Sequence, residues 1–211
     1  MYPKILGMVP VYSAVQPEPF LNFLILSQYT GKAELEGRYA VRWITPGPKW
    51  SVVDARNTAS KLVIEEDLDW LFMIDDDMVV PKDILDHLLR RDVDIISPIF
   101  FRSAGGIDPL VYTIDRFGDR TPIYDYPKNA IFETPGGNGT GAMLIRGSVL
   151  KEMAGITPIW QNRGEGEDVD FCDRARQRGF KTWCDSTVEV RQMSLPVAIG
   201  AAHYEASRLT R

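Results

Sequence analysis

The chain has 211 residues, 45% of them apolar, which is enough for one substantial hydrophobic core and predicts a single domain. Its 29 acidic and 24 basic residues give a formal net charge of −5, which argues against nucleic acid or an anionic membrane as a partner, because both attract basic surfaces. The sequence has no apolar stretch that could span a bilayer and no signal-peptide pattern, so we expect a soluble, cytoplasmic protein with a small-molecule substrate.

The first hundred residues alternate strand and helix patterns. Short apolar runs predict strands buried on both faces, and apolar residues at helical spacing predict the helices between them. This alternation predicts an α/β/α sandwich with a mostly parallel central sheet flanked by helices, in which ligands bind at the C-terminal ends of the strands. We expect strands at 4–11, 39–44, 70–74 and 94–98, and helices at 19–30, from a capping box at Ser51 and Asp54, and after Pro81.

The second half of the sequence is less regular. Residues 102–138 are rich in Gly, Pro, Asp and Tyr and predict a loop-rich excursion with strand-like pieces at 109–114 and 130–133. After the glycine-rich run 136–141, a strand is expected to return to the sheet. We predict this strand at 142–145, helices at 148–153 and 167–178, and a last strand at 181–184.

Three consecutive aspartates, Asp75, Asp76 and Asp77, follow the apolar strand at 70–74 and are the most informative feature of the sequence. Each close pair of carboxylates costs about 4 kcal/mol at about 4 Å and an effective dielectric of about 20, so the block needs a positive partner. A divalent cation such as Mg²⁺ or Mn²⁺ is suited to this, because hard ions bind carboxylate oxygens and keep positions open for phosphates. A solvated turn at the end of a strand is the simpler alternative.

Several motifs occur in an order that resembles the GT-A class of nucleotide-sugar glycosyltransferases, particularly the group that includes cellulose and chitin synthases. The resemblance covers most of the chain and implies a single domain, 1–211, with a nucleotide-binding half at 1–100 and an acceptor and catalytic half at 101–211. Its motifs are Pro10-Val11-Tyr12, Arg56-Asn57 at a helix start, the strand into Asp-x-Asp, the run Gly139 to Arg146, and Gly166-Glu167-Asp168-Val169-Asp170-Phe171-Cys172.

In this family the Asp-x-Asp pair holds a metal against the diphosphate of a nucleotide-sugar donor. The resemblance therefore places Asp75 near the ribose and the metal and Asp77 on the metal, with Asp76 beside them, and it implies a UDP- or GDP-sugar. As a Lewis acid, the ion would stabilise the charge of the leaving diphosphate. Other expected contacts to the nucleotide sugar are Pro10, Tyr12, Asp54, Arg56 and Asn57; Tyr12 could instead pack, and Arg56 could instead form a structural ion pair with Asp54 or Asp75.

The acidic residues at the start of the predicted helix 167–178 match the position of the family's catalytic base. The resemblance implies that Asp168 deprotonates the acceptor hydroxyl with inversion at the anomeric carbon, and Glu167 is the substitute candidate. Simple capping of a helix N-terminus would also explain acidic residues here. Gly139, Thr140 and Gly141 are expected to line the sugar or acceptor pocket or to form a plain turn, and Trp160 is expected to contact the acceptor or to pack.

The third metal ligand departs from the family pattern. A histidine often follows the last strand in this family, but the matching position here holds Gln192, whose amide oxygen is a weaker ligand for a hard cation. His203 could take this role if the C-terminal segment folds back.

Two other functions remain open from the sequence. Asp75-Asp76-Asp77-Met78-Val79 also fits the nucleophile motif of haloacid-dehalogenase-like phosphatases, although that motif normally lies on the first strand. The missing histidine leaves room for a non-catalytic relative that only binds nucleotide sugars.

Overall fold

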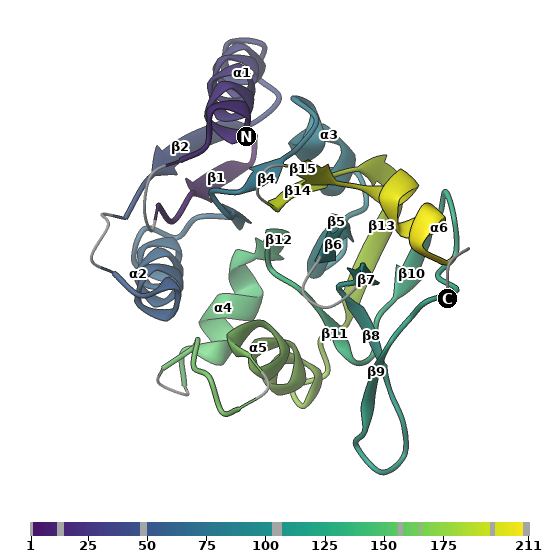
Figure 1. Cartoon of the computed structure of the whole chain (residues 1–211). Coiled ribbons are helices and arrows are strands. Elements are labelled where there is room, and N and C mark those ends of the chain that lie inside the picture. The colour runs from purple at the N-terminus through teal and green to yellow at the C-terminus, as the bar shows by residue number, and fades with distance from the viewer. Residues whose placement is uncertain are drawn as a thin grey trace.

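The computed structural model describes residues 2–11, 15–46, 50–102, 107–155, 158–164, 166–194 and 197–208. A central sheet of seven strands runs through the molecule in the order β10-β13-β5-β12-β3-β1-β2 (Figure 1). Five of these strands are parallel, whereas β12 and β10 run in the opposite direction. The strands are β1 Lys4–Met8, β2 Ala40–Ile44, β3 Trp70–Ile74, β5 Ile95–Ile99, β10 Ile131–Glu133, β12 Ala142–Arg146 and β13 Thr182–Glu189.

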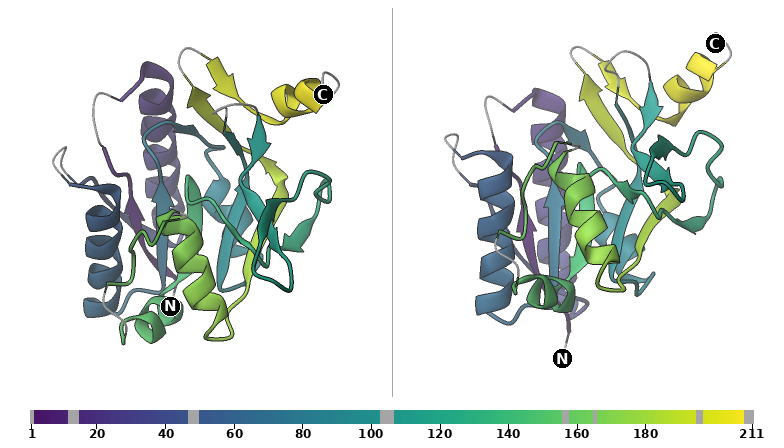
Figure 2. Two further views of the ribbon diagram at one scale, coloured as in Figure 1. Left: turned by 60° about the horizontal axis from the view of Figure 1, so that its bottom comes forward. Right: turned by 90° about the horizontal axis from the view of Figure 1, so that it is seen from below.

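Helices cover both faces of this sheet, and each face has its own hydrophobic core (Figures 1 and 2). One core contains side chains from α1 and α3, such as Leu26 and Leu85. The other contains side chains from α2, α4 and α5, such as Ala59, Leu150 and Phe171. The helices are α1 Pro17–Leu35, α2 Val52–Glu65, α3 Ile84–Leu89, α4 Gly147–Met153, α5 Glu167–Arg176 and α6 Ala201–Arg208.

Among the described residues, three small sheets accompany the central sheet. One combines β15, β14 and β4, a second combines β11, β8 and β9, and β6 pairs with β7. Their bounds are β4 Met78–Val79, β6 Phe101–Arg102, β7 Asp108–Pro109, β8 Val111–Ile114, β9 Arg120–Pro122, β11 Gly137–Asn138, β14 Arg191–Ser194 and β15 Val197–Ile199.

The predicted α/β/α class, with a mostly parallel sheet flanked by helices, is confirmed. Strand β3 is paired with β1 and β12 along its two edges, and its side chains enter both hydrophobic cores, for example Phe72 on one face and Leu71 on the other, which explains its continuous apolar sequence. Within the described ranges, no helix is both long enough and apolar enough to cross a membrane.

Several predicted element boundaries were wrong: β1 ends at Met8 and not at residue 11, and β13 runs to Glu189 and not only to residue 184. Helix α1 continues past Gly31 to Leu35 and ends instead near Gly37, which has a φ of 70° and whose N–H donates to the carbonyl of Glu34. Glycine adopts this left-handed conformation at helix ends without a steric penalty, whereas Gly31 lies on an open surface of the helix. The chain also continues after β13 into β14, β15 and α6, none of which was expected.

Candidate functional site

The aspartate loop, Asp75–Asp77, begins at the C-terminal end of β3, where the parallel strands end (Figure 1). Two backbone hydrogen bonds fix the loop: the N–H of Asp75 donates to the carbonyl of Gly141 at 2.9 Å, and the N–H of Met78 donates to the carbonyl of Asp75 at 3.1 Å. The loop therefore joins β3 to β4 by a tight turn and is anchored on the glycine-rich segment that precedes β12.

Arg56, in the first turns of α2, connects the aspartate loop to the start of α5. Its side chain is only 2% exposed, its Nη2 donates to Asp75 Oδ1 at 3.2 Å, and its Nη1 pairs with Glu167. A buried guanidinium with two carboxylate partners is a strong, directional contact because its donors are fixed in one plane. Three segments that are far apart in the sequence thus meet at one cation.

Trp160 is fully buried and packs against the guanidinium of Arg56. Its ring stacks on Phe171 with centroids 4.1 Å apart, and the Arg56 guanidinium lies over the indole at 5.5 Å. Trp160 Nε1 donates to Ser60 Oγ at 2.8 Å. The side-chain amide of Asn57 donates to the carbonyl of Trp160 and accepts from the N–H of Trp160. The face of the Trp160 indole that was expected to contact an acceptor sugar is therefore covered. Asn57, which was expected to contact the nucleotide sugar, instead binds the backbone of Trp160.

Asp77 and Gln192 lie side by side because β4 and β14 pair in an antiparallel register, with Gln192 opposite Met78. Gln192 Nε2 donates to Asp77 Oδ2 at 2.9 Å, and the N–H of Met193 donates to the Asp77 carbonyl at 2.8 Å. Among the described residues, neither Asp77 Oδ1 nor Gln192 Oε1 has a hydrogen-bond partner, although both atoms are buried. Buried oxygens without donors on two neighbouring side chains are atoms that a hard cation could satisfy.

Burial raises the pKa of two carboxyls in this loop, those of Asp75 and Asp77. The pKa of Asp75 rises to about 6, chiefly by desolvation, with the Arg56 charge opposing and the Asp77 charge adding to the rise. The pKa of Asp77 is also raised, again mainly by burial, while the hydrogen bond from Gln192 acts in the opposite direction. A bound cation would favour the charged form of both groups.

The remaining candidate ligands do not form a complete metal site with protein atoms alone. His203 lies exposed on α6, and its Nδ1 accepts a hydrogen bond from the N–H of Gly200. Among the described residues, no group of three or more His, Cys, Asp and Glu side chains could hold a metal on its own. Mg²⁺ is commonly bound by one or two carboxylates together with substrate phosphates, so Asp77 and Gln192 fit a site that a ligand completes.

The start of α5 presents Asp168 beside Glu167. Asp168 Oδ1 accepts from the N–H of Val169 at 2.8 Å within the first turn, whereas the N-cap residue is Gly166, which has no side chain to cap the helix. The pKa of Asp168 is raised, chiefly by burial and also by the charge of Glu167, while the hydrogen bond from Val169 opposes the rise, and a raised pKa makes a carboxylate a stronger base. Gly166 has a φ of 114°, and a Cβ there would lie 2.7 Å from Asp168 Oδ1.

The glycine-rich segment is packed into the protein instead of lining an open pocket. Gly139, Thr140 and Gly141 are buried, and a Cβ on Gly141 would lie 2.8 Å from the ring of Phe100. Its glycines allow the backbone to pass close to Phe100, and its link to the site is the hydrogen bond from Asp75 to Gly141.

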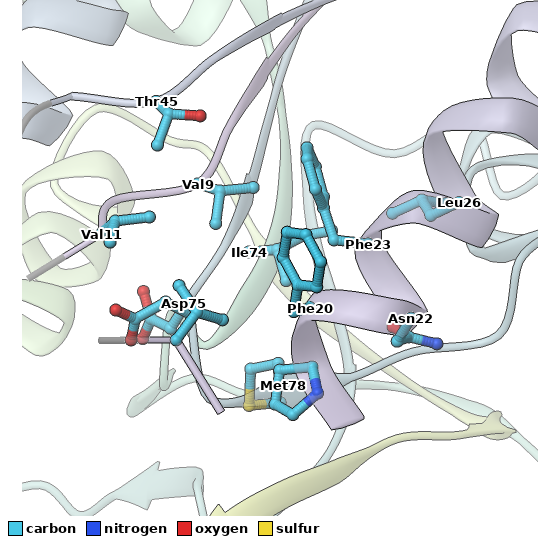
Figure 3. Close-up of a pocket in the computed structure, with 13 residues that line it drawn as sticks. Val9, Val11, Phe20, Asn22, Phe23, Leu26, Thr45, Ile74, Asp75 and Met78 are labelled. Atoms are coloured by element: carbon cyan, nitrogen blue, oxygen red, sulfur yellow. The ribbon is translucent and has the colours of Figure 1, made fainter. Parts of the chain in front are cut away.

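Two hollows flank the aspartate loop. The first, of about 170 Å³, is apolar: Phe20 and Phe23 of α1 face Val9 and Ile74 across it (Figure 3). The second, of about 420 Å³, lies on the α2 side and is more polar. It is lined by Pro10, Val11, Pro46, Trp50, Ser51, Val52, Ala55 and the aspartate loop.

The remaining predicted contacts lie in different places. Pro10 and Asp76 line the second hollow, and Tyr12 lies outside the described residues. Asp54 is exposed and completes the capping box with Ser51, whose Oγ accepts from the N–H of Asp54 at 3.1 Å. Sequence reasoning missed Trp50, whose signal was an aromatic residue placed between a Pro-Gly-Pro break and a helix cap.

Neither a protein-family model nor a curated protein sequence matches the chain. Among solved structures, A197 from STIV is similar with a TM-score of 0.61 and 17% identity, over 95% of this chain and 91% of that one. A putative glucose-1-phosphate thymidylyltransferase from Bacillus anthracis, solved in complex with a sucrose, is similar with a TM-score of 0.51 and 11% identity, over 98% and 94% of the two chains. At these identities the similarity establishes the fold that the three proteins share.

Proposed function

We propose that the chain is a glycosyltransferase of the GT-A type, which moves a sugar from a UDP- or GDP-sugar to an acceptor hydroxyl. The observation that carries this proposal is the bridge by Arg56 between Asp75 and Glu167. It holds the aspartate loop, where a diphosphate and a cation would bind, next to Asp168, where a base is needed. The fold shared with a putative thymidylyltransferase also supports a protein that handles nucleotides.

The hollow on the α2 side is the proposed donor site, with Pro10 and Asp75 at its wall. A Mg²⁺ or Mn²⁺ ion would be held by Asp77 and Gln192 through their unpartnered oxygens, with Asp75 close by. When bound, the ion would supply Lewis-acid stabilisation of the departing diphosphate. Asp76 and Arg56 would contribute a negative and a positive charge near the diphosphate.

Asp168 is the proposed general base. It takes the proton of the acceptor hydroxyl, whose oxygen forms a bond to the anomeric carbon of the donor sugar. The bond from that carbon to the diphosphate oxygen breaks, and the nucleoside diphosphate leaves with the electron pair. Attack from the opposite face gives inversion. Glu167, which pairs with Arg56, is the less suitable base because the ion pair holds its carboxylate.

Calorimetry with UDP and GDP, each with and without Mn²⁺, tests the donor and metal assignments together. Wild-type protein should bind one nucleotide only when Mn²⁺ is present, and Asp77→Asn should lose at least tenfold in affinity, because it removes a charged ligand. Asp67→Asn is the matched control, since Asp67 is exposed and precedes the opposite end of β3. Equal metal-dependent binding by Asp77→Asn would refute the metal assignment, and turnover of p-nitrophenyl phosphate would favour a phosphatase.

A further inference from the structure

A hollow of about 590 Å³ lies beside the start of α5. It is formed between the β8–β9 hairpin and the start of α5, and shares no lining residue with the hollow on the α2 side. Its volume falls within the range of about 300–1,000 Å³ that is typical of small-molecule sites. Its main lining residues are Arg102, Tyr112, Asp119, Arg120, Pro122 and Val169.

One lining residue of this hollow directly follows the proposed base in the sequence. This residue is Val169, and its N–H donates to Asp168 Oδ1 at 2.8 Å. The pKa of Tyr112 is raised, chiefly by burial. The negative charge of Asp168 adds to this rise, and the positive charge of Arg102 opposes it. The phenol therefore stays protonated at neutral pH and can donate a hydrogen bond beside the base.

The wall of the hollow is fixed in place before any ligand binds. Arg120 Nε donates to the carbonyl of Gly136 at 2.7 Å, and its Nη2 pairs with Asp173 of α5 at 2.7 Å. Tyr112 lies in the middle strand of the small sheet, between Gly137 on one side and Pro122 on the other. A rigid wall lowers the entropy lost on binding, so the hollow is suited to recognising a ligand.

The lining matches the chemistry of a sugar. Tyr112 and Arg102 offer hydrogen-bond donors and Asp119 offers an acceptor, whereas Pro122 and Val169 offer apolar surface. A saccharide needs this combination, because each hydroxyl both donates and accepts and the ring C–H groups favour apolar contact. The oppositely charged side chains in the lining make a neutral ligand more suitable than a strongly charged one.

We propose that this hollow, the hairpin pocket, binds a neutral saccharide acceptor, and that Tyr112 donates a hydrogen bond to a hydroxyl beside the one that Asp168 deprotonates. The inference rests on the proposed glycosyltransferase function and gives its acceptor a site. Tyr112 takes the place that the sequence suggested for Trp160, whose ring is buried.

The test uses the full chain and the donor nucleotide sugar found by calorimetry, with a panel of methyl and p-nitrophenyl glycosides of neutral hexoses as acceptors. We expect at least one glycoside to accelerate release of the nucleoside diphosphate. For that glycoside, Tyr112→Phe and Arg102→Ala should each raise KM about tenfold, the factor that corresponds to about 1.4 kcal/mol. Their Kd for the nucleoside diphosphate should stay within twofold, because the hairpin pocket does not line the donor site.

Tyr124→Phe is the matched control, because it removes a phenol from an exposed position outside the hairpin pocket. An unchanged KM in both pocket variants would overturn the hairpin pocket while leaving the glycosyltransferase proposal intact. Release that no glycoside accelerates would overturn the saccharide class. A wild-type chain that binds neither UDP nor GDP would instead overturn the proposed function, and with it this inference.

Discussion

At the scale of single residues, Arg56 has two roles that are difficult to separate. It neutralises Asp75 and Glu167, and it is buried between them and the indole of Trp160. A buried charge is tolerated only when its partners remain, so each of the three charged groups depends on the others. The same contacts that position the site therefore also stabilise the fold.

Arg56→Met should lower the free energy of unfolding by about 3 kcal/mol, because it leaves two partly buried carboxylates without their cation. Adding Glu167→Gln to this variant should restore part of the loss, since one of the uncompensated charges is then removed. Urea unfolding measures both changes. Arg42→Met is the control: Arg42 is 51% exposed in its pair with Glu66, and surface pairs contribute less than about 1 kcal/mol. A double variant less stable than Arg56→Met would contradict this account.

Glu167 also sets the pH at which Asp168 can act. A base works in its ionised form, so the transfer rate should fall as the pH is lowered through the raised pKa of Asp168. Glu167→Gln removes a negative charge that raises the pKa of Asp168, and it frees Arg56, whose positive charge lowers the pKa of Asp168. The acidic limb of kcat should therefore move to lower pH. The profile of kcat against pH measures this, with Glu65→Gln as an exposed control. A limb that stays in place or moves upward would count against Asp168 as the base.

At the scale of elements, the glycine-rich segment before β12 is a packing device that supports the site. The carbonyl of Gly141 accepts from the N–H of Asp75, while the missing side chain leaves room for Phe100 and Met78. Close packing of this kind makes the position of the aspartate loop sensitive to one added methyl group.

Gly141→Ala should cost about 1–3 kcal/mol of stability and weaken metal-dependent nucleotide binding, because the new Cβ would lie 2.8 Å from the buried Phe100 ring and displace the backbone that holds Asp75. The same substitution at Gly31 is a matched contrast. A Cβ at Gly31 meets nothing within 4 Å in the middle of α1, so Gly31→Ala should stabilise by about 0.5–1 kcal/mol. Thermal unfolding and calorimetry of both variants distinguish the two effects, and a stabilising Gly141→Ala would disprove the packing role.

The elements that the sequence predicted well are those whose signals are local. Strand β3 is a continuous apolar run that lies in the middle of the sheet, and the start of α2 is marked by a side-chain cap within three residues. The end of α1 was misplaced because Gly31 and Gly37 look alike in sequence, and only the φ of 70° at Gly37 distinguishes them. Strand β14 was missed because its pairing partner, β4, lies more than a hundred residues earlier.

At the scale of the whole molecule, the candidate site depends on contacts between distant segments. The aspartate loop was predicted from its carboxylates alone, and the neighbouring position of Gln192 was predicted from the family pattern. The partnership of Arg56 with Glu167 could not be predicted, since it spans 111 residues and requires α2 and α5 to lie on the same face of the sheet. The burial of Trp160 was equally hidden, because an aromatic side chain serves packing and sugar binding alike.

Strand β14 of the C-terminal segment lies against the aspartate loop, on the side where we propose that a cation binds, so ligand binding should change its dynamics. Strands β4 and β14 pair through only two residue pairs, whereas β3 is paired along both edges in the central sheet. Without ligand, amide exchange should therefore be much faster at Met78, Val79 and Gln192 than in β3.

A cation held between Asp77 and Gln192, together with a nucleoside diphosphate, would join β4 to β14 and should slow exchange in both strands at least tenfold, with little change in β3. Hydrogen exchange followed by mass spectrometry, with Mn²⁺ and the nucleotide added separately and together, measures this. Exchange in the β8–β9 hairpin should not respond, because the hairpin lines no part of the donor site. Protection limited to α2 and the aspartate loop, with β14 unaffected, would show that Gln192 is not a ligand and that the cation is held by the carboxylates and the diphosphate.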